Sequence, residues 1–241
     1  MKRFLVVSIL FLSSVLYCDQ SQFSFFQPPP DWLMSNPKDF KDGVKIGFVA
    51  SKRKIFTPAI TLTLEKIPCS EKTYIEIVKK NHKSDITKDV RELGLLQTKS
   101  GSAHLLQIDT KNTWGKVRIL QAILVKEGVA YIQTASCLRE DFLKIHRDLL
   151  DSFNSLSVSD DLVSSLKEKK DFEERMESLF RSWRKHLRTA KGEKEVLFKG
   201  SFFQKNQWGP FTEYITKNHS DCGICWQILA IQYVKEKLMD M

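Results

Sequence analysis

The chain has 241 residues, enough for one large domain or two modest ones. It carries 38 Lys and Arg against 29 Asp and Glu, a net charge of +9 that is compatible with anionic membrane surfaces, acidic polymers or acidic partners. Acidic residues are interleaved almost everywhere, and no arginine-rich stripe alternates with aromatic residues, so the composition argues against a nucleic-acid-binding protein.

The first 18 residues have the layout of a secretory signal. Lys2 and Arg3 form a positive start, and residues 4–17 follow without a charge. This apolar run is shorter than the roughly 20 residues that a membrane-spanning helix needs. We therefore predict export to the periplasm or envelope, with removal of residues 1–18, which leaves a mature chain of net charge +7.

Cys18 leaves two kinds of processing open. It ends the apolar run, where bacterial lipoprotein signals place the cysteine that is acylated. Small residues usually precede such a cysteine, and Tyr17 departs from that pattern. Ordinary cleavage by signal peptidase near Cys18 is the alternative. If Cys18 is acylated, several acyl chains would anchor the protein stably, because each buried CH2 contributes about 0.8 kcal/mol.

Strands and helices follow one another after a proline-rich entry at residues 28–30. Ser70 is the predicted cap of a helix over residues 71–83, and an amphipathic helix is predicted over residues 139–153. Apolar alternation and turn signals such as Ser100-Gly101 predict about six strands. Their expected ranges are 44–50, 60–65, 93–99, 102–110, 116–125 and 129–135.

Six local motifs follow one another in this part of the chain. They are Pro30-Asp31-Trp32, the strand Ile60–Lys66, the helix start Tyr74-Ile75-Glu76, the hairpin around Gly101, the segment Ala130–Ala135, and a closing helix from Asp141-Phe142 to Ser152-Phe153. In this order the chain resembles the PsbP/Mog1-like domain, which includes bacterial exported proteins and lipoproteins, over about residues 23–156. The resemblance implies an α+β fold, an α-β-α sandwich with a central antiparallel sheet. It implies a binding or assembly factor and brings no common catalytic residues.

Residues 157–241 lie outside this resemblance and are predicted to form an all-helical C-terminal domain. Ser159 before two aspartates is the expected cap of one long helix. Its apolar seam is expected at Leu162, Leu166, Phe172, Met176, Leu179, Trp183 and Leu187. A short strand is expected over residues 195–203, a short helix around residues 208–215 and a final helix over residues 222–239.

The seam of the long helix has two interpretations. It either packs on the second half of the tail or docks on a partner. In the second case the partner-binding candidates are the basic end of the helix and its tryptophan: Arg181, Trp183, Arg184, Lys185 and Arg188.

Cys222 and Cys225 are the candidate catalytic residues of a thiol-disulfide protein, because a helix start favours a thiolate at Cys222. Thioredoxin-like enzymes place such a pair after a strand near the front of the fold, whereas here it lies in a helical tail. A structural or idle pair is the alternative. A structural zinc ion would need four ligands and only His219 lies nearby, so we predict no metal site.

The remaining candidates point to packing or surface roles. Cys69 and Cys137 are expected to be buried or paired with each other. His82, His104, His146 and His186 have no partnered nucleophile at a recognisable spacing. The sequence lacks a phosphate-binding loop, a nucleophile elbow and a paired-histidine zinc helix, so no cofactor is predicted.

These observations favour an exported, noncatalytic envelope protein that acts as a binding or assembly module. The expected partner is another envelope protein or a small ligand, with membrane association through a lipid at Cys18 if that residue is acylated. The alternatives are a redox protein that uses Cys222 and Cys225, and a structural spacer of the envelope.

Overall fold

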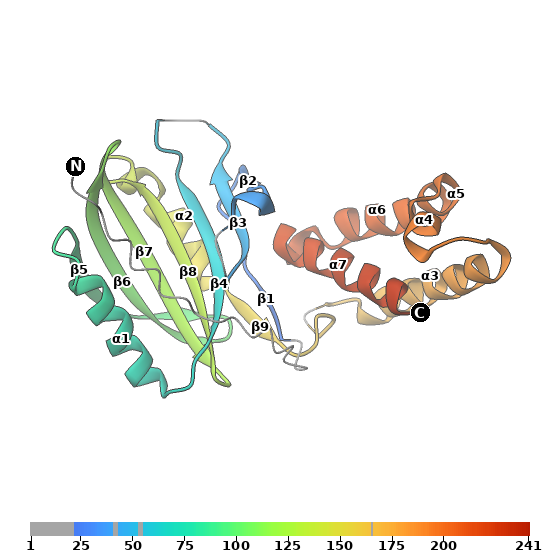
Figure 1. Ribbon diagram of the computed structural model, residues 1–241, viewed down its shortest axis with the longest axis horizontal. Coiled ribbons are helices and arrows are strands. Elements are labelled where there is room, and N and C mark those ends of the chain that lie inside the picture. The colour runs from blue at the N-terminus through green and yellow to red at the C-terminus, as the bar shows by residue number, and fades with distance from the viewer. Residues whose placement is uncertain (1–21, 41–42, 53–54, 165) are drawn as a thin grey trace, which may run out of the picture.

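A computed structural model of the chain describes residues 22–40, 43–52, 55–164 and 166–241. A β-sheet with helices on its faces forms one lobe, and an all-helical tail forms the other (Figure 1). The predicted signal, residues 1–18, and the lipidation candidate Cys18 lie outside the described residues. Among those residues, none of the helices combines the length and the apolar character that crossing a membrane requires.

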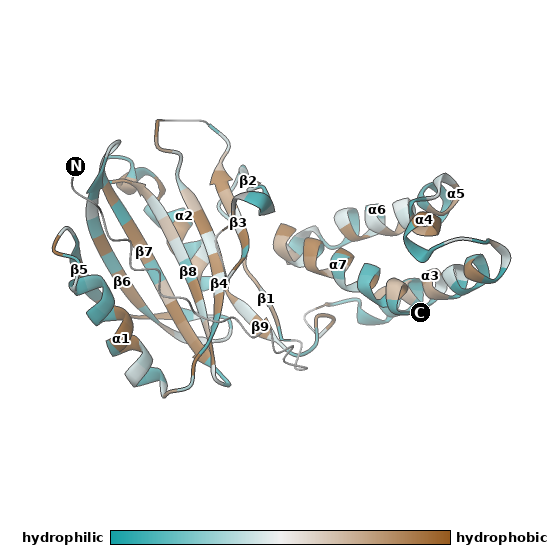
Figure 2. Ribbon diagram, in the orientation of Figure 1, coloured by the Kyte–Doolittle hydropathy of each residue, from teal (hydrophilic) through white to brown (hydrophobic). Residues whose placement is uncertain are grey.

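The central sheet is antiparallel throughout and has seven strands. From one edge to the other these are β2 (Trp32–Met34), β3 (Val44–Ala50), β4 (Ala59–Lys66), β8 (Val129–Leu138), β7 (Gly115–Lys126), β6 (Gly101–Asn112) and β5 (Asp89–Thr98). The strand that raises the count above the predicted six is β2, which is too short to show alternation. Figure 2 shows apolar and polar residues interspersed along these strands, as expected where successive side chains point to opposite faces.

One helix covers each face of the sheet. On the first face α1 (Glu71–Lys83) buries Tyr74 and Ile75 in a cluster with Leu106, Ile108, Ile123, Ala130 and Ile132. On the second face α2 (Phe142–Asn154) buries Leu149 and Phe153 in a cluster with Leu105, Leu120 and Tyr131, strand residues that alternate with the first set. These layers confirm the predicted α-β-α sandwich and the α+β class.

A side-chain cap sets the first residue of α1, and a backbone turn sets that of α2. Ser70 Oγ accepts a hydrogen bond from the backbone nitrogen of Thr73 at 3.3 Å, so α1 has the predicted bounds. Helix α2 begins three residues later than predicted. The backbone nitrogen of Asp141 donates to Leu138 O at 3.0 Å, and this turn occupies the residues between β8 and the helix.

A second, two-stranded sheet closes the sandwich. In it β1 (Phe23–Phe25) pairs antiparallel with β9 (Ser157–Ser159). Neither strand was predicted, because three residues are too few for a periodic signal. The sandwich therefore includes residues beyond the expected boundary at 156.

The tail is helical, as predicted, with two differences. Its elements are α3 (Lys169–Thr189), α4 (Lys194–Lys199), α5 (Ser201–Phe203), the π-helical turn η2 (Gln204–Trp208), α6 (Gly209–Asn218), the turn η3 (Ser220–Cys222) and α7 (Ile224–Asp240). The long helix begins at Lys169 rather than after Ser159, and residues 195–203 are helical rather than a strand. In Figure 1, α3, α6 and α7 form the body of this lobe, with α4 and α5 at its far end.

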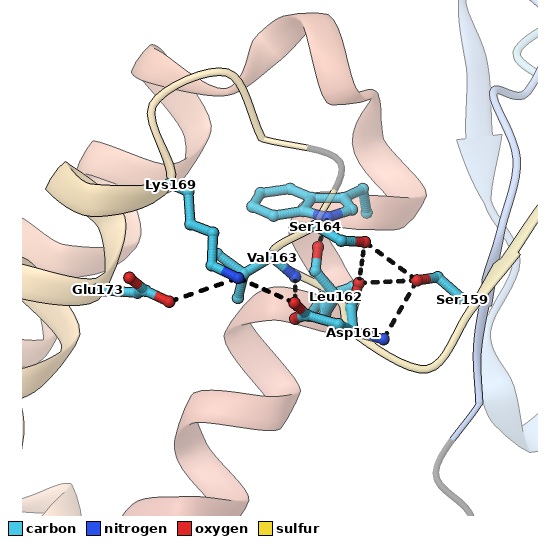
Figure 3. Close-up of polar contacts among 8 residues, drawn as sticks. Ser159, Asp161, Leu162, Val163, Ser164, Lys169 and Glu173 are labelled. Atoms are coloured by element: carbon cyan, nitrogen blue, oxygen red, sulfur yellow. Dashed lines mark hydrogen bonds and ion pairs between the residues drawn. The ribbon is translucent and has the colours of Figure 1, made fainter.

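The late start of α3 has a local cause at residues 159–164. Ser159 Oγ accepts from the backbone nitrogen of Asp161 at 3.1 Å, and Asp161 Oδ1 accepts from that of Val163 at 2.9 Å (Figure 3). These side-chain bonds close turns that compete with a helix. Lys169 then binds Asp161 at 3.1 Å and lies 3.8 Å from Glu173, so the network ends at the first turn of α3.

The junction between sandwich and tail is packed. Trp226 of α7 is fully buried, and its indole nitrogen donates to Leu162 O at 2.9 Å. The ring of Phe23 lies 5.4 Å from that of Tyr233, centroid to centroid. Buried side chains of the second sheet face, of the junction and of the tail belong to one continuous hydrophobic cluster.

Candidate binding groove

An open groove of about 660 Å³ lies between α1 and the β5–β6 hairpin. Ile75, Leu95 and Val125 contribute apolar side chains to its lining. The hairpin forms because Gly101 has a φ of +133°, which only glycine adopts readily. Thr98 Oγ1 also donates to Gly101 O at 2.7 Å, which fixes the turn at one end of the groove.

Charged side chains surround these apolar residues. Lys79 Nζ lies 2.7 Å from Glu76 Oε1 and 2.9 Å from Glu92 Oε2, so it joins α1 to β5. His104 Nε2 lies 3.4 Å from Glu71 Oε1. The hydrogen bond from Lys79 lowers the pKa of Glu76 below its usual value. The rim of the groove therefore carries both signs of charge beside an apolar patch, which suits a peptide better than a strongly charged ligand.

Strand β5 forms the outer edge of the groove and of the sheet. It is the last strand in the order, so β6 pairs with one side of its backbone and no described strand pairs with the other. Leu93 is 48% exposed and Leu95 is 66% exposed. A bulge interrupts the pairing with β6 between Glu92 and Gly94, where Gly94 has a φ of +95°. Exposed apolar residues on a long edge strand are a known mark of strand addition by a partner.

The predicted redox pair lies at the start of α7. Cys222 and Cys225 are both free thiols; Cys225 is buried, and Cys222 is partly exposed. Burial, reinforced by the neighbouring Asp221 carboxylate, raises the pKa of Cys222 to about 11, and burial raises that of Cys225 to about 12. Burial and the Asp221 carboxylate act against the thiolate that was expected at Cys222.

Cys69 and Cys137 lie in the sandwich. Cys137 is buried in the sandwich, and Cys69 is partly exposed at the turn before α1. Cys69 packs against the hydrophobic cluster under α1. The structure does not join these two residues in a disulfide.

The five partner-binding candidates of α3 divide into two groups. Arg181, Arg184, Lys185 and Arg188 are exposed. Trp183, in contrast, is fully buried, and its indole nitrogen donates to Leu238 O of α7 at 2.7 Å. The docking interpretation of Trp183 is therefore wrong, and the alternative, in which the seam packs on the second half of the tail, is confirmed.

A chain of polar groups runs from the buried His219 to the surface of the tail. Tyr214 Oη donates to Asp171 Oδ2 at 2.7 Å and lies 3.0 Å from His219 Nε2. The guanidinium of Arg175 binds the same carboxylate at 3.1 Å and lies 4.2 Å from the centre of the Tyr214 ring. Burial lowers the pKa of His219. In the part of the chain that the structure describes, His219 joins no group of three or more residues able to hold a metal ion.

Sequence spacing did not indicate the groove. His104 was expected only to pack or to lie on the surface, and Leu95 was expected to be an ordinary strand residue. The exposure of Leu95 follows from the position of β5 at the sheet edge. That position depends on strand order, for which the pattern of a single strand carries no signal.

Comparison with known proteins gives structural neighbours alone. The chain matches neither a family model nor a curated protein. Its structure is similar to LpqN, involved in cell envelope biogenesis of Mycobacterium tuberculosis, with 11% identity and a TM-score of 0.45, covering 60% of this chain and 87% of that one.

Two further neighbours carry the names of the family that the sequence resembles. Cyanobacterial PsbP from Synechocystis sp. PCC 6803 has 13% identity and a TM-score of 0.40, with 59% of this chain and 95% of that chain covered. The Ran-binding protein Mog1p of Saccharomyces cerevisiae has 15% identity and a TM-score of 0.38, with 54% and 86% covered. The predicted resemblance is thus confirmed as one of fold, and at these values it carries no argument about function.

Proposed function

We propose that this protein is an exported, noncatalytic binding module of the cell envelope, and that it holds an extended segment of a partner protein along β5. The observation that carries the proposal is the ten-residue edge strand with exposed Leu93 and Leu95 beside the groove. An added strand would pair with the free side of the β5 backbone. Its side chains would reach Leu95 and the apolar lining of the groove.

The charged rim supports a peptide occupant. The groove lining carries three lysines and three glutamates, so a segment entering the groove meets little net charge. Lys72 also lines the groove and is available to a carboxylate of the segment. Selectivity would then come from one apolar side chain placed at Leu95 and from the charges that flank it.

The first experiment locates the partner in the native cell. A photo-crosslinking amino acid replaces Leu95 in one variant and Leu143 in another. Leu143 is 77% exposed on α2, on the opposite face of the sheet, and serves as the matched control. We expect a specific adduct from position 95 and none from position 143. Equal adducts from both positions, or none from either, would contradict a partner at β5.

The second experiment tests strand addition with the identified partner. Backbone amides of β5 should gain protection from hydrogen exchange when the partner binds, because they acquire hydrogen-bond acceptors. Leu95→Glu should weaken binding at least tenfold, and Leu143→Glu should leave it unchanged. Protection confined to the tail would place the partner elsewhere. A small molecule that protects the groove without protecting β5 would favour the ligand alternative.

The redox alternative makes a different prediction for the cysteines. With pKa values of about 11 and about 12, the thiols of Cys222 and Cys225 should react slowly with an alkylating agent at pH 7. Rapid alkylation of Cys222 in the folded protein near neutral pH would support a thiol-disulfide protein instead. The spacer alternative predicts no specific adduct at any exposed position.

Export and anchoring have their own test. If Cys18 is acylated, fatty-acid label should appear on the wild-type protein and disappear in Cys18→Ser, with release of that variant from membranes. Absence of label together with unchanged fractionation would leave ordinary signal cleavage as the processing route. Retention of residues 1–18 in the purified native protein would argue against export.

A further inference from the structure

The far end of the tail concentrates positive charge. It consists of the end of α3, the connection to α4, α4, α5 and the first residues of η2, here called the basic tip (residues 181–205). Figure 1 shows α4, α5 and the connection at the end of the molecule remote from the sheet. The tip holds eight basic residues and two acidic ones, Glu193 and Glu195. The basic residues are Arg181, Arg184, Lys185, Arg188, Lys191, Lys194, Lys199 and Lys205.

These charges differ from those at the other end of α3. There Lys169, Lys170 and Arg175 each pair with a carboxylate. Among the described residues, none of the eight basic side chains of the tip forms a salt bridge. Most of the net charge of the protein is therefore unpaired and gathered in one place.

Apolar side chains protrude from the same tip. Phe202 is 66% exposed and Val196 is 63% exposed. Their neighbours fix this arrangement, because Phe198 and Phe203 are buried, and the ring centroid of Phe203 lies 4.7 Å from that of Trp183. With Phe203 inside the core, the adjacent Phe202 is held outward.

We propose that the basic tip binds a membrane surface of anionic phospholipids. Phe202 and Val196 enter the boundary between headgroups and acyl chains, and the surrounding lysines and arginines bind lipid phosphates. Basic side chains suit this position because their aliphatic stems lie along apolar surface while their charges reach the headgroups. An acidic protein would satisfy the charges alone. The exposed Phe202 at the end of the lobe favours the lipid surface.

The test uses the chain from residue 19 onward, which keeps every described residue and removes the apolar leader that could itself enter vesicles. Its sedimentation is measured with vesicles of phosphatidylcholine alone and of phosphatidylcholine with 30 mol% phosphatidylglycerol (about a third of the lipid, chosen so that steering by charge is strong). We expect binding to the anionic vesicles only, and release when salt screens the charges.

Charge reversal within the basic tip distinguishes binding by the tip from binding that depends only on the net charge of the protein. Arg188→Glu, Lys191→Glu and Lys199→Glu in one protein should weaken binding by at least about hundredfold, since each basic residue lost near an anionic surface costs about fivefold and the added carboxylates repel the lipids. The matched control reverses Lys45, Lys111 and Arg147, which are exposed on the sandwich. It changes the net charge equally and should lose far less binding. Equal losses in the two triple variants would show that net charge, and not the tip, drives binding.

The apolar contribution has its own pair of variants. Phe202→Ser should weaken binding about tenfold, because its ring no longer leaves water. Leu143→Ser, on the sandwich, should have no effect. Failure of the wild-type chain to sediment with anionic vesicles would overturn the proposal. Binding of polyglutamate but not of vesicles would assign the tip to an acidic polymer or protein instead. The β5 crosslinking result does not depend on any of these outcomes.

Discussion

One buried polar side chain of the sandwich lacks hydrogen bonds, whereas three in the tail are bonded. In the sandwich, Gln133 of β8 is fully buried, and neither its amide nitrogen nor its amide oxygen has a hydrogen-bond partner among the described residues. In the tail, the indole nitrogens of Trp183 and Trp226 and the ring of His219 are buried and all bonded. Backbone ladders already fix the geometry of a sheet, so it tolerates an idle amide. Helices have no such mutual ladder, and the tail uses directed side-chain bonds to fix their relative positions.

The largest expected effect concerns the junction. Trp226→Ala should lower the free energy of unfolding by about 3–5 kcal/mol, because it opens a cavity in the core and removes the hydrogen bond from the indole to Leu162 O. Trp114→Ala removes a ring that is 54% exposed and should change stability by about 0.5 kcal/mol or less. Denaturant unfolding measures both. Similar losses in the two variants would mean that the tail is not fixed through Trp226.

A smaller effect tests whether the hydrogen bond from Trp183 to Leu238 O stabilises the tail in addition to packing. Trp183→Phe keeps an aromatic ring but removes the donor to Leu238 O, which should cost about 1–3 kcal/mol. Trp208→Phe is the control for lost ring volume, because its indole nitrogen forms no hydrogen bond with a described residue. If both variants lose the same stability, packing and not hydrogen bonding orders the tail helices.

Removing the unbonded amide from the sandwich should raise the free energy of unfolding, whereas the tail substitutions lower it. Gln133→Met keeps the length of the side chain and removes the two unpaired atoms, so it should raise the free energy of unfolding by about 1–3 kcal/mol. Gln107→Met removes an amide that donates to Asp109 Oδ2 at 3.2 Å and should not stabilise the protein. A loss of stability in Gln133→Met would show that the amide is bonded in solution and would remove the contrast between the two cores.

The smallest effect is a pH dependence of the tail. Burial lowers the pKa of His219 below 6.5, although the carboxylates of Asp221, Asp171 and Glu168 act in the opposite direction. The unfolded chain therefore takes up a proton at a higher pH than the folded one. The stability that the folded state gains from a neutral His219 is complete above about pH 6.5 and is lost as the pH falls through the pKa of the folded state.

Thermal unfolding between pH 8 and pH 5 (a range on the order of His titration) checks this expectation. The melting temperature should fall on the acidic side in the wild type and fall less in His219→Gln. An identical slope in both proteins would assign the pH dependence to other groups.

The sequence predicts most of the sandwich and little of its surfaces. Helix α1 agrees with prediction at both ends, because a cap at Ser70 and a regular apolar stripe act locally. Ser159 offers the same kind of cap, yet its hydroxyl closes a turn with Asp161 instead of starting α3. The local turn bonds are accompanied by a hydrogen bond from Trp226, which reaches the intervening Leu162 from far along the chain. No local pattern contains that information.

The candidate binding surfaces likewise contain features that the sequence predicts and features that depend on tertiary packing. The basic residues at the end of α3 could be recognised from the sequence. Trp183 was correctly placed on the apolar seam, but the sequence left open whether the tail itself or a partner covers that seam. Trp183 is buried because α4, α5 and α7 fold back over it. The exposure of Phe202 and of Leu95 likewise depends on which neighbouring residues occupy the core in the folded protein.

The pairing of β1 with β9 has a consequence for the timing of folding. The first residues of the described chain pair with residues 157–159, so the loop that they close contains nearly the whole sandwich. Any process that delivers the chain from its N-terminus, synthesis or passage through a membrane, releases β1 long before β9. Phe23 and Phe25 must then wait without their partner strand, which makes a late, slow closing step the expected last event of sandwich assembly. A chaperone that protects this N-terminal segment would act in that interval.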